Sequence, residues 1–275
     1  MIIDSHVHFW RLARGDYDWL TPDLATLYRD FEPADLAPVL EAAGVAGVIA
    51  VQAAATEAET GFLLELARLN PLILGVVGWT DFTSPRAPEA IARLARQARL
   101  KGLRPMLQDL GDDDFILRPA ADAALAAMAS HGLRLDALVR PRHLPRLITV
   151  RERHPDLAMV VDHAAKPDIA AGAWEPWASD MRRLGGDGRT CCKLSGLITE
   201  AGTDWTADSL RPYVDLILDA FGSDRVMWGG DWPVLTMAGT YDRWMTATRD
   251  LLGERSASER SVILSGAARR FYGLE

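Results

Sequence analysis

The chain has 275 residues, of which 49% are hydrophobic and 25% charged, and its formal net charge is −8 at pH 7. This length is ordinary for one α/β barrel, and we expect a single barrel domain over residues 1–275. The acidic balance argues against a nucleic-acid partner. No apolar run approaches the ~18 residues of a membrane span, and no secretory signal is recognisable, so we expect no membrane insertion and a cytoplasmic location.

Eight short apolar or β-branched runs alternate with Ala/Leu/Arg-rich stretches of helical period. The runs predict strands that begin near residues 2, 45, 72, 101, 132, 157, 190 and 225. Helix signals lie between them, such as Pro33 in the first turn and Gly44 at the end of one helix, and a Ser256-x-x-Glu259 capping box at the start of the last. This alternation predicts an α/β fold, a (β/α)8 TIM barrel with distortion allowed, and a doubly wound sheet is the alternative.

In such a barrel the C-terminal ends of all strands meet at one mouth, where catalytic side chains lie. The predicted strand ends are dense in polar groups, which a purely structural barrel end would not need. They include Asp4, His6, His8, Gln52, Asp81, Arg104, Gln108, Asp136, His163, Lys166, Lys193, Ser195 and Asp231.

His6 and His8 are two residues apart on the first predicted strand, so their side chains share a face. Neutral imidazoles and a carboxylate make a good site for Zn²⁺ or a similar ion. His163 and Asp231 come from other strand ends, which favours a functional pair over two solvated histidines. We therefore expect His6, His8, His163 and Asp231 to be the candidate ligands of one divalent cation, with zinc preferred.

The remaining residues of the mouth have two interpretations. Arg104 and Lys193 can contact a substrate or pair with acids that hold the strands. Tryptophans near strand ends can stack on a sugar ring or pack in the core, and we expect core packing for Trp228. The candidate substrate contacts are Trp10, Gln52, Met106, Gln108, Lys166 and Trp232.

Several motifs of other enzyme classes are missing. The chain has no GxSxG elbow, no GxxxxGK[ST] loop and no GxGxxG at a strand-to-helix turn, so serine hydrolase, P-loop and dinucleotide-binding functions lack support. Its two cysteines, Cys191 and Cys192, are adjacent and supply neither a disulfide framework nor a CxxC metal site.

Six blocks in order carry a resemblance to a known family: DSHVHFW, KGLRPMLQ, VVDHAAKP, CKLSGL, VMWGGDWPV and ILSGAARRFYGL. Together they resemble the amidohydrolase superfamily over nearly the whole chain, and most closely its sugar-lactonase branch. That branch includes L-fuconolactonase, L-rhamnonolactonase and 2-pyrone-4,6-dicarboxylate lactonase. The resemblance implies a metal-type histidine pair at His6 and His8, a later-strand histidine at His163, and a general base at Asp231.

The chain departs from the binuclear members of the superfamily at two positions. It has Arg104 where they carry a bridging lysine and Asp136 where they carry a histidine. Two metals are therefore not expected. Some members of the lactonase branch work without a metal, so one cation or none stays open.

These features predict hydrolysis of a small-molecule sugar-acid lactone, of the L-fuconolactone kind, to the open aldonate. Asp231 would activate water as the general base and return the proton to the ring oxygen. Either a cation or an array of His163, Arg104 and Lys193 would polarise the carbonyl group. The alternatives are a metal-dependent decarboxylase of the same superfamily and a catalytically silent barrel that binds sugar acids.

Overall fold

The computed structural model describes residues 1–274, and its eight strands form one parallel sheet in the order β1 to β8. The strands are β1 (Ile2–Val7), β2 (Val45–Val51), β3 (Ile73–Gly78), β4 (Leu100–Leu103), β5 (Arg134–Ala137), β6 (Met159–Val161), β7 (Cys191–Leu194) and β8 (Val226–Trp228). Each falls in one of the predicted runs, and the fold is the predicted TIM barrel.

The ring closes between β8 and β1 through the segment that follows β8, not through a paired strand ladder. The His8 N–H donates to the Trp232 carbonyl over 2.7 Å, and the Asp231 N–H donates to the His6 carbonyl over 2.8 Å. β8 itself has only three residues. The barrel is therefore distorted between β8 and β1, in the segment that contains Asp231.

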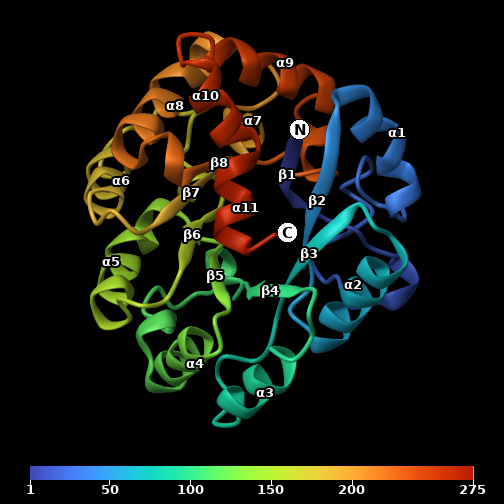
Figure 1. Ribbon diagram of the computed structural model, residues 1–275, viewed down its shortest axis with the longest axis vertical. Coiled ribbons are helices and arrows are strands. Elements are labelled where there is room, and N and C mark those ends of the chain that lie inside the picture. The colour runs from blue at the N-terminus through green and yellow to red at the C-terminus, as the bar shows by residue number, and fades with distance from the viewer. Residues whose placement is uncertain (275) are drawn as a thin grey trace.

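Most of the helices surround the strands on the outside of the ring, and the last helix lies over its middle (Figure 1). They are α1 (Pro33–Ala43), α2 (Glu57–Leu69), α3 (Ala87–Leu94), α4 (Pro119–Ser130), α5 (Leu144–Arg153), α6 (Trp177–Gly185), α7 (Leu197–Ala201), α8 (Ala207–Phe221), α9 (Tyr241–Leu251), α10 (Ala257–Ser261) and α11 (Ala267–Tyr272). Gly44 ends α1 at φ 71°, and the Ser256–Glu259 capping box opens α10 as predicted. A π-helical turn, Val262–Gly266, separates α10 from α11 within what the sequence predicts as one helix.

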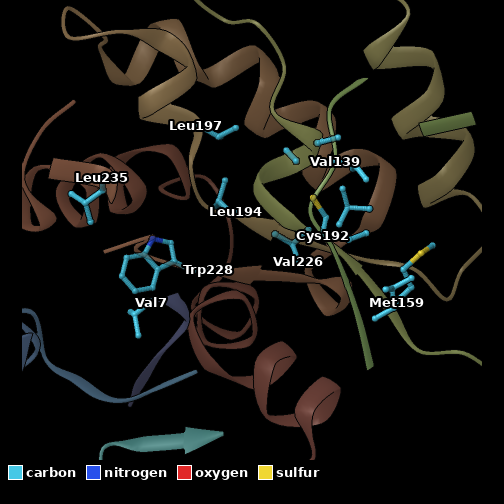
Figure 2. Packing of buried hydrophobic residues seen from close by; sticks show 14 of the residues in the cluster. Val7, Val139, Met159, Cys192, Leu194, Leu197, Val226, Trp228 and Leu235 are labelled. Carbon is cyan, nitrogen blue, oxygen red and sulfur yellow. The ribbon is translucent and has the colours of Figure 1, made fainter. Parts of the chain in front are cut away.

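Two apolar layers follow from the alternation of side chains along each strand. The outer layer packs between strands and helices, and Figure 2 shows Trp228, Cys192 and Leu194 in it. The Trp228 indole N–H donates to the Thr248 hydroxyl over 3.0 Å, which confirms core packing for this residue.

The inner layer closes the N-terminal end of the barrel. It joins inward-facing strand residues such as Ile49 and Val77 to Tyr272 of α11. In Figure 1, α11 crosses the middle of the ring. Among the described residues, no helix combines the length and the apolar character that a membrane crossing demands.

Candidate active site

Strained backbone carries two of the predicted site residues into the mouth. His163 (φ 52°) and Asp231 (φ 57°) both adopt the left-handed region, as do the residues between His163 and Lys166. Non-glycine residues occupy this region at a cost of roughly 1–3 kcal/mol each, and such strain clusters at functional sites. A short 3-10 turn, Asp162–Ala165, follows β6 and contains this strained run.

Gly196 makes room for His163. A Cβ at this position would lie 2.6 Å from His163 Nδ1, and the backbone is also left-handed, at φ 67°. The neighbouring Ser195 hydroxyl lies 2.9 Å from the same nitrogen. The Ser-Gly pair after β7 therefore holds one edge of the imidazole and leaves the other edge facing the mouth.

Asp4 ties β1 to the segment that carries Asp231. Its carboxyl group accepts hydrogen bonds from the His6 N–H (3.0 Å), the Gly230 N–H (2.8 Å) and the Tyr241 hydroxyl (2.7 Å). Burial raises the pKa of Asp4 to about 6, against the lowering effect of these hydrogen bonds. Asp4 is therefore a structural link under the mouth.

The four residues predicted as ligands lie close together. The Nε2 atoms of His6 and His8 are 3.2 Å apart, and Asp231 Oδ1 lies 3.3 Å from His8 Nε2 and 3.9 Å from His163 Nε2. Ligand atoms of His6, His163 and Asp231 all lie within 4.8 Å of one another. Two atoms bound tetrahedrally to one zinc ion are about 3.3–3.4 Å apart. The donor types and spacing thus fit one divalent cation.

The protonation states of the three histidines and Asp231 are suitable both for binding a metal ion and for a general base. Burial lowers the pKa values of His6, His8 and His163, so the imidazoles are neutral near pH 7. Burial alone would raise the pKa of Asp231, but His163 and His8 outweigh it and the pKa lies below its usual range. Asp231 is therefore a carboxylate next to neutral imidazoles.

A buried ionic layer lies directly beneath the imidazoles. Lys193 Nζ lies 2.5 Å from Asp136 Oδ2, 3.0 Å from Asp162 Oδ1 and 3.1 Å from His6 Nδ1. Lys193 and both carboxylates are fully buried. Burial raises the pKa of Asp136 to about 6; for Asp162 the charges of Lys193 and Arg104 outweigh burial and lower the pKa.

Asp162 was not among the residues that the sequence analysis selected. The only signal for it was its position directly before His163 at the end of β6.

Arg104 pairs with a buried acid and also lines the mouth. Its Nη1 lies 3.4 Å from His6 Nε2 and 3.6 Å from Asp162 Oδ2, and its Nη2 donates to the Gln52 carbonyl. The Gln52 amide donates back to the Arg104 carbonyl over 2.7 Å. Arg104 therefore joins β2 to β4 and still reaches the mouth.

A pocket of about 340 Å³ opens at the mouth. Its predicted lining residues are His8, Arg104, Met106, Gln108, His163, Lys166 and Asp231. No sequence pattern had singled out the other lining residues, which are Trp19, Leu24, Ala53, Asp109, Leu138, Val234 and Met237. The pocket thus has charged groups at its base and a largely apolar wall.

Three of the predicted substrate contacts, Trp10, Gln52 and Trp232, do not line this pocket as the structure describes it. Trp10 is fully buried and its indole N–H donates to the Arg29 carbonyl over 2.8 Å. Trp19 stands at the pocket instead, with its N–H donating to the Ala53 carbonyl over 2.7 Å. Both lie in or near an irregular segment, where no periodicity tells which side chain faces the mouth.

The fold is that of an amidohydrolase. The amidohydrolase family model matches residues 3–274, and the chain belongs to this family. An L-fucono-1,5-lactonase of Burkholderia ambifaria is 43% identical over 277 residues, which cover 99% of this chain and 96% of that protein. The L-fucono-1,5-lactonase of Burkholderia multivorans is 39% identical, with the same two coverages, 99% and 96%.

A solved structure agrees with these sequence matches. The crystal structure of an amidohydrolase from Burkholderia multivorans with bound zinc aligns with a TM-score of 0.93 and 38% identity over the full length of both chains. The resemblance read from the sequence blocks is confirmed.

Proposed function

We propose that this protein hydrolyses a sugar-acid lactone of the L-fuconolactone type to the open aldonate. The observation that carries the proposal is Asp231, a buried carboxylate held at φ 57° that faces a 340 Å³ pocket beside the imidazoles. Two relatives of 43% and 39% identity are L-fucono-1,5-lactonases. This kinship favours a lactonase over the decarboxylase and the silent binding protein.

Asp231 acts as the general base. Its Oδ1 removes a proton from water while the water oxygen bonds to the lactone carbonyl carbon. The tetrahedral intermediate then collapses, the bond from that carbon to the ring oxygen breaks, and Asp231 returns the proton to the departing oxygen. One carboxylate thus serves both steps, and the products are a carboxylic acid and a hydroxyl group on one open chain.

Positive charge and N–H donors stabilise the oxyanion of the intermediate. The Arg104 guanidinium and the Lys166 ammonium both line the pocket. Groups of this kind are most effective when they are fixed in advance in a site that excludes water. Arg104 is held by Gln52 from behind, so it does not need to reorganise during the reaction.

The donor set of the mouth also fits a cation, and we propose zinc as the ion that it would hold, through Asp231, His163, His8 and His6. A bound zinc ion supplies positive charge to a carbonyl oxygen. The zinc in a relative of 38% identity supports this assignment.

The direct test measures acid release from L-fucono-1,5-lactone and from a panel of aldonolactones. Because lactones also open spontaneously, each rate is compared with an enzyme-free blank. Release of carbon dioxide from an aromatic acid would favour the decarboxylase, and tight binding of a sugar acid with no turnover would favour the silent barrel. The cytoplasmic location and the single domain over residues 1–275 stay predictions.

A further inference from the structure

We infer that Lys193 is a positioning residue that fixes the tautomer of His6, with the ring hydrogen on Nε2. His6 is then the donor, and His8 the acceptor, of the hydrogen bond between their Nε2 atoms. The two members of the His-x-His pair therefore have different roles. The kinetic consequence of this inference rests on the proposed lactone hydrolysis; the tautomer itself does not.

The first observation that supports this tautomer is the contact between Lys193 Nζ and His6 Nδ1. A lysine ammonium has three N–H donors and no acceptor. Lys193 Nζ has three acceptors around it: Asp136 Oδ2 at 2.5 Å, Asp162 Oδ1 at 3.0 Å and His6 Nδ1 at 3.1 Å. The side chain has no exposed surface, so water does not replace any of them. His6 Nδ1 must accept, and the hydrogen of the neutral ring is on Nε2.

The second observation concerns the hydrogen bond between His6 Nε2 and His8 and does not involve Lys193. His8 Nδ1 lies 2.8 Å from the Val51 carbonyl oxygen, which can only accept. The neutral His8 ring therefore carries its hydrogen on Nδ1 and has a lone pair on Nε2. That lone pair is 3.2 Å from His6 Nε2, so His6 is the donor of this hydrogen bond. Both sides lead to the same tautomer.

Three longer contacts would favour other tautomers, and they are weaker. Asp231 Oδ1 is 3.3 Å from His8 Nε2, whereas the Val51 oxygen is 2.8 Å from His8 Nδ1. Asp162 Oδ1 is 3.5 Å from His6 Nδ1, farther than Lys193 Nζ at 3.1 Å. Arg104 Nη1 is 3.4 Å from His6 Nε2, farther than the His8 acceptor. Asp231 Oδ1, at 3.8 Å from His6 Nε2, adds negative charge on the side of the N–H. The nearest partner at each nitrogen decides the tautomer.

Lys193 is placed to act only through His6. It is fully buried and does not line the pocket, so it does not touch a substrate. Asp136, which holds it, also accepts from the Tyr272 hydroxyl of α11 over 2.6 Å. A cation can bind His6 through Nε2 only after the hydrogen there has moved, whereas His8 offers Nε2 as it stands.

The decisive experiment is a long-range ¹H–¹⁵N correlation spectrum of the ¹⁵N-histidine-labelled wild-type protein, prepared free of divalent ions. His6 and His8 are assigned from the signals lost in His6→Gln and His8→Gln. We expect His6 to be protonated on Nε2 and His8 on Nδ1. A His6 ring protonated mainly on Nδ1 overturns the inference. No lactone enters this measurement, so its failure is distinct from failure of the proposed function.

Lys193→Met tests the role of the lysine, with Lys166→Met as the matched control. Lys193→Met should shift His6 toward the Nδ1-protonated form, because Asp162 is then the nearest group to that nitrogen. It should lower kcat by about 10–100-fold, the usual effect of a supporting partner, with KM nearly unchanged. Lys166→Met removes a pocket ammonium and should leave the His6 tautomer as in the wild type.

An unchanged His6 tautomer in folded Lys193→Met contradicts the positioning role, and so does the same tautomer shift in Lys166→Met. If Lys193→Met does not fold, the wild-type spectrum still decides the tautomer. Lys193→Arg, which keeps a donor at this place, then decides the role: it should retain the His6 tautomer, and loss of that tautomer in a folded Lys193→Arg protein overturns the inference.

Discussion

The N-terminal end of the barrel is filled with apolar side chains, whereas its mouth is filled with buried polar and charged ones. At the N-terminal end, α11 places Tyr272 against inward-facing aliphatic side chains such as Ile3 and Val160, and the layer is almost wholly apolar. At the mouth, buried imidazoles, carboxylates and cations lie together, and non-glycine residues adopt left-handed backbone. The closed end thus supplies packing, while the mouth carries strain and buried charge that serve chemistry.

Gly196→Ala should have the largest effect on the mouth. The new Cβ would lie 2.6 Å from His163 Nδ1, so the imidazole must move. A displacement of about 1 Å at a catalytic group can reduce turnover about 100-fold, and we expect a loss of this size.

Gly188→Ala is the matched control for this prediction. Gly188 has a similar left-handed backbone, φ 73°, but open space around the new Cβ. It should lose stability and keep its activity. Equal kcat values for the two variants would show that backbone strain, and not contact with His163, matters at Gly196.

The stability of the mouth should respond to pH through Glu59 on α2, a fully buried residue that accepts a hydrogen bond from the Tyr17 hydroxyl over 2.6 Å. Burial raises its pKa from 4.5 to about 7. The folded protein therefore binds this proton more tightly than the unfolded chain. Its contribution to stability is fully present below pH 4.5 and is lost as pH rises through about 7.

Urea unfolding of the wild type and of Glu59→Gln across pH 5–8 tests this prediction. The free energy of unfolding of the wild type should fall relative to that of the variant by about 2 kcal/mol over this range. Parallel pH profiles for the two proteins would contradict a raised pKa at Glu59.

Tyr272→Phe should have a smaller effect, and at the opposite end of the barrel. The variant keeps the ring in the apolar layer and removes the hydroxyl that donates to Asp136 over 2.6 Å. Loss of a hydrogen bond to a carboxylate costs about 1–2 kcal/mol, so the free energy of unfolding should fall by about this amount. An unfolding curve that coincides with that of the wild type would show that the hydrogen bond between Tyr272 and Asp136 does not stabilise the protein.

Removal of divalent ions should have the smallest effect on turnover. Arg104 and Lys166 already place positive charge at the pocket, so we expect kcat to stay within about twofold after chelation. A decrease of tenfold or more that zinc restores would make the cation part of the reaction.

The fold could be predicted because its signals are local. Each strand is a short run such as the one that begins at Val45, and Pro33 and Gly44 mark the ends of α1 by their backbone preferences. The common mouth then follows from the geometry of the barrel, which is why His6, His163 and Asp231 could be brought together from residues far apart in the sequence.

The missed features depend on long-range packing. Trp19 and not Trp10 lines the pocket, and the segment that carries them is irregular, so no periodicity predicts which of the two does so. The role of Asp162 depends on Lys193 of the next strand. The need for Gly196 arises only when His163 adopts its left-handed backbone. None of these can be read from a local pattern.

The rate of acid release from L-fucono-1,5-lactone by the wild type and by Asp231→Asn tests most directly whether Asp231 is the base of a lactone hydrolysis. Both proteins should have the same circular dichroism spectrum. General-base catalysis contributes about 10²- to 10⁴-fold, so the variant should retain less than about one hundredth of the wild-type kcat. A folded Asp231→Asn protein with more than that, or a wild type no faster than the enzyme-free blank, would contradict the account.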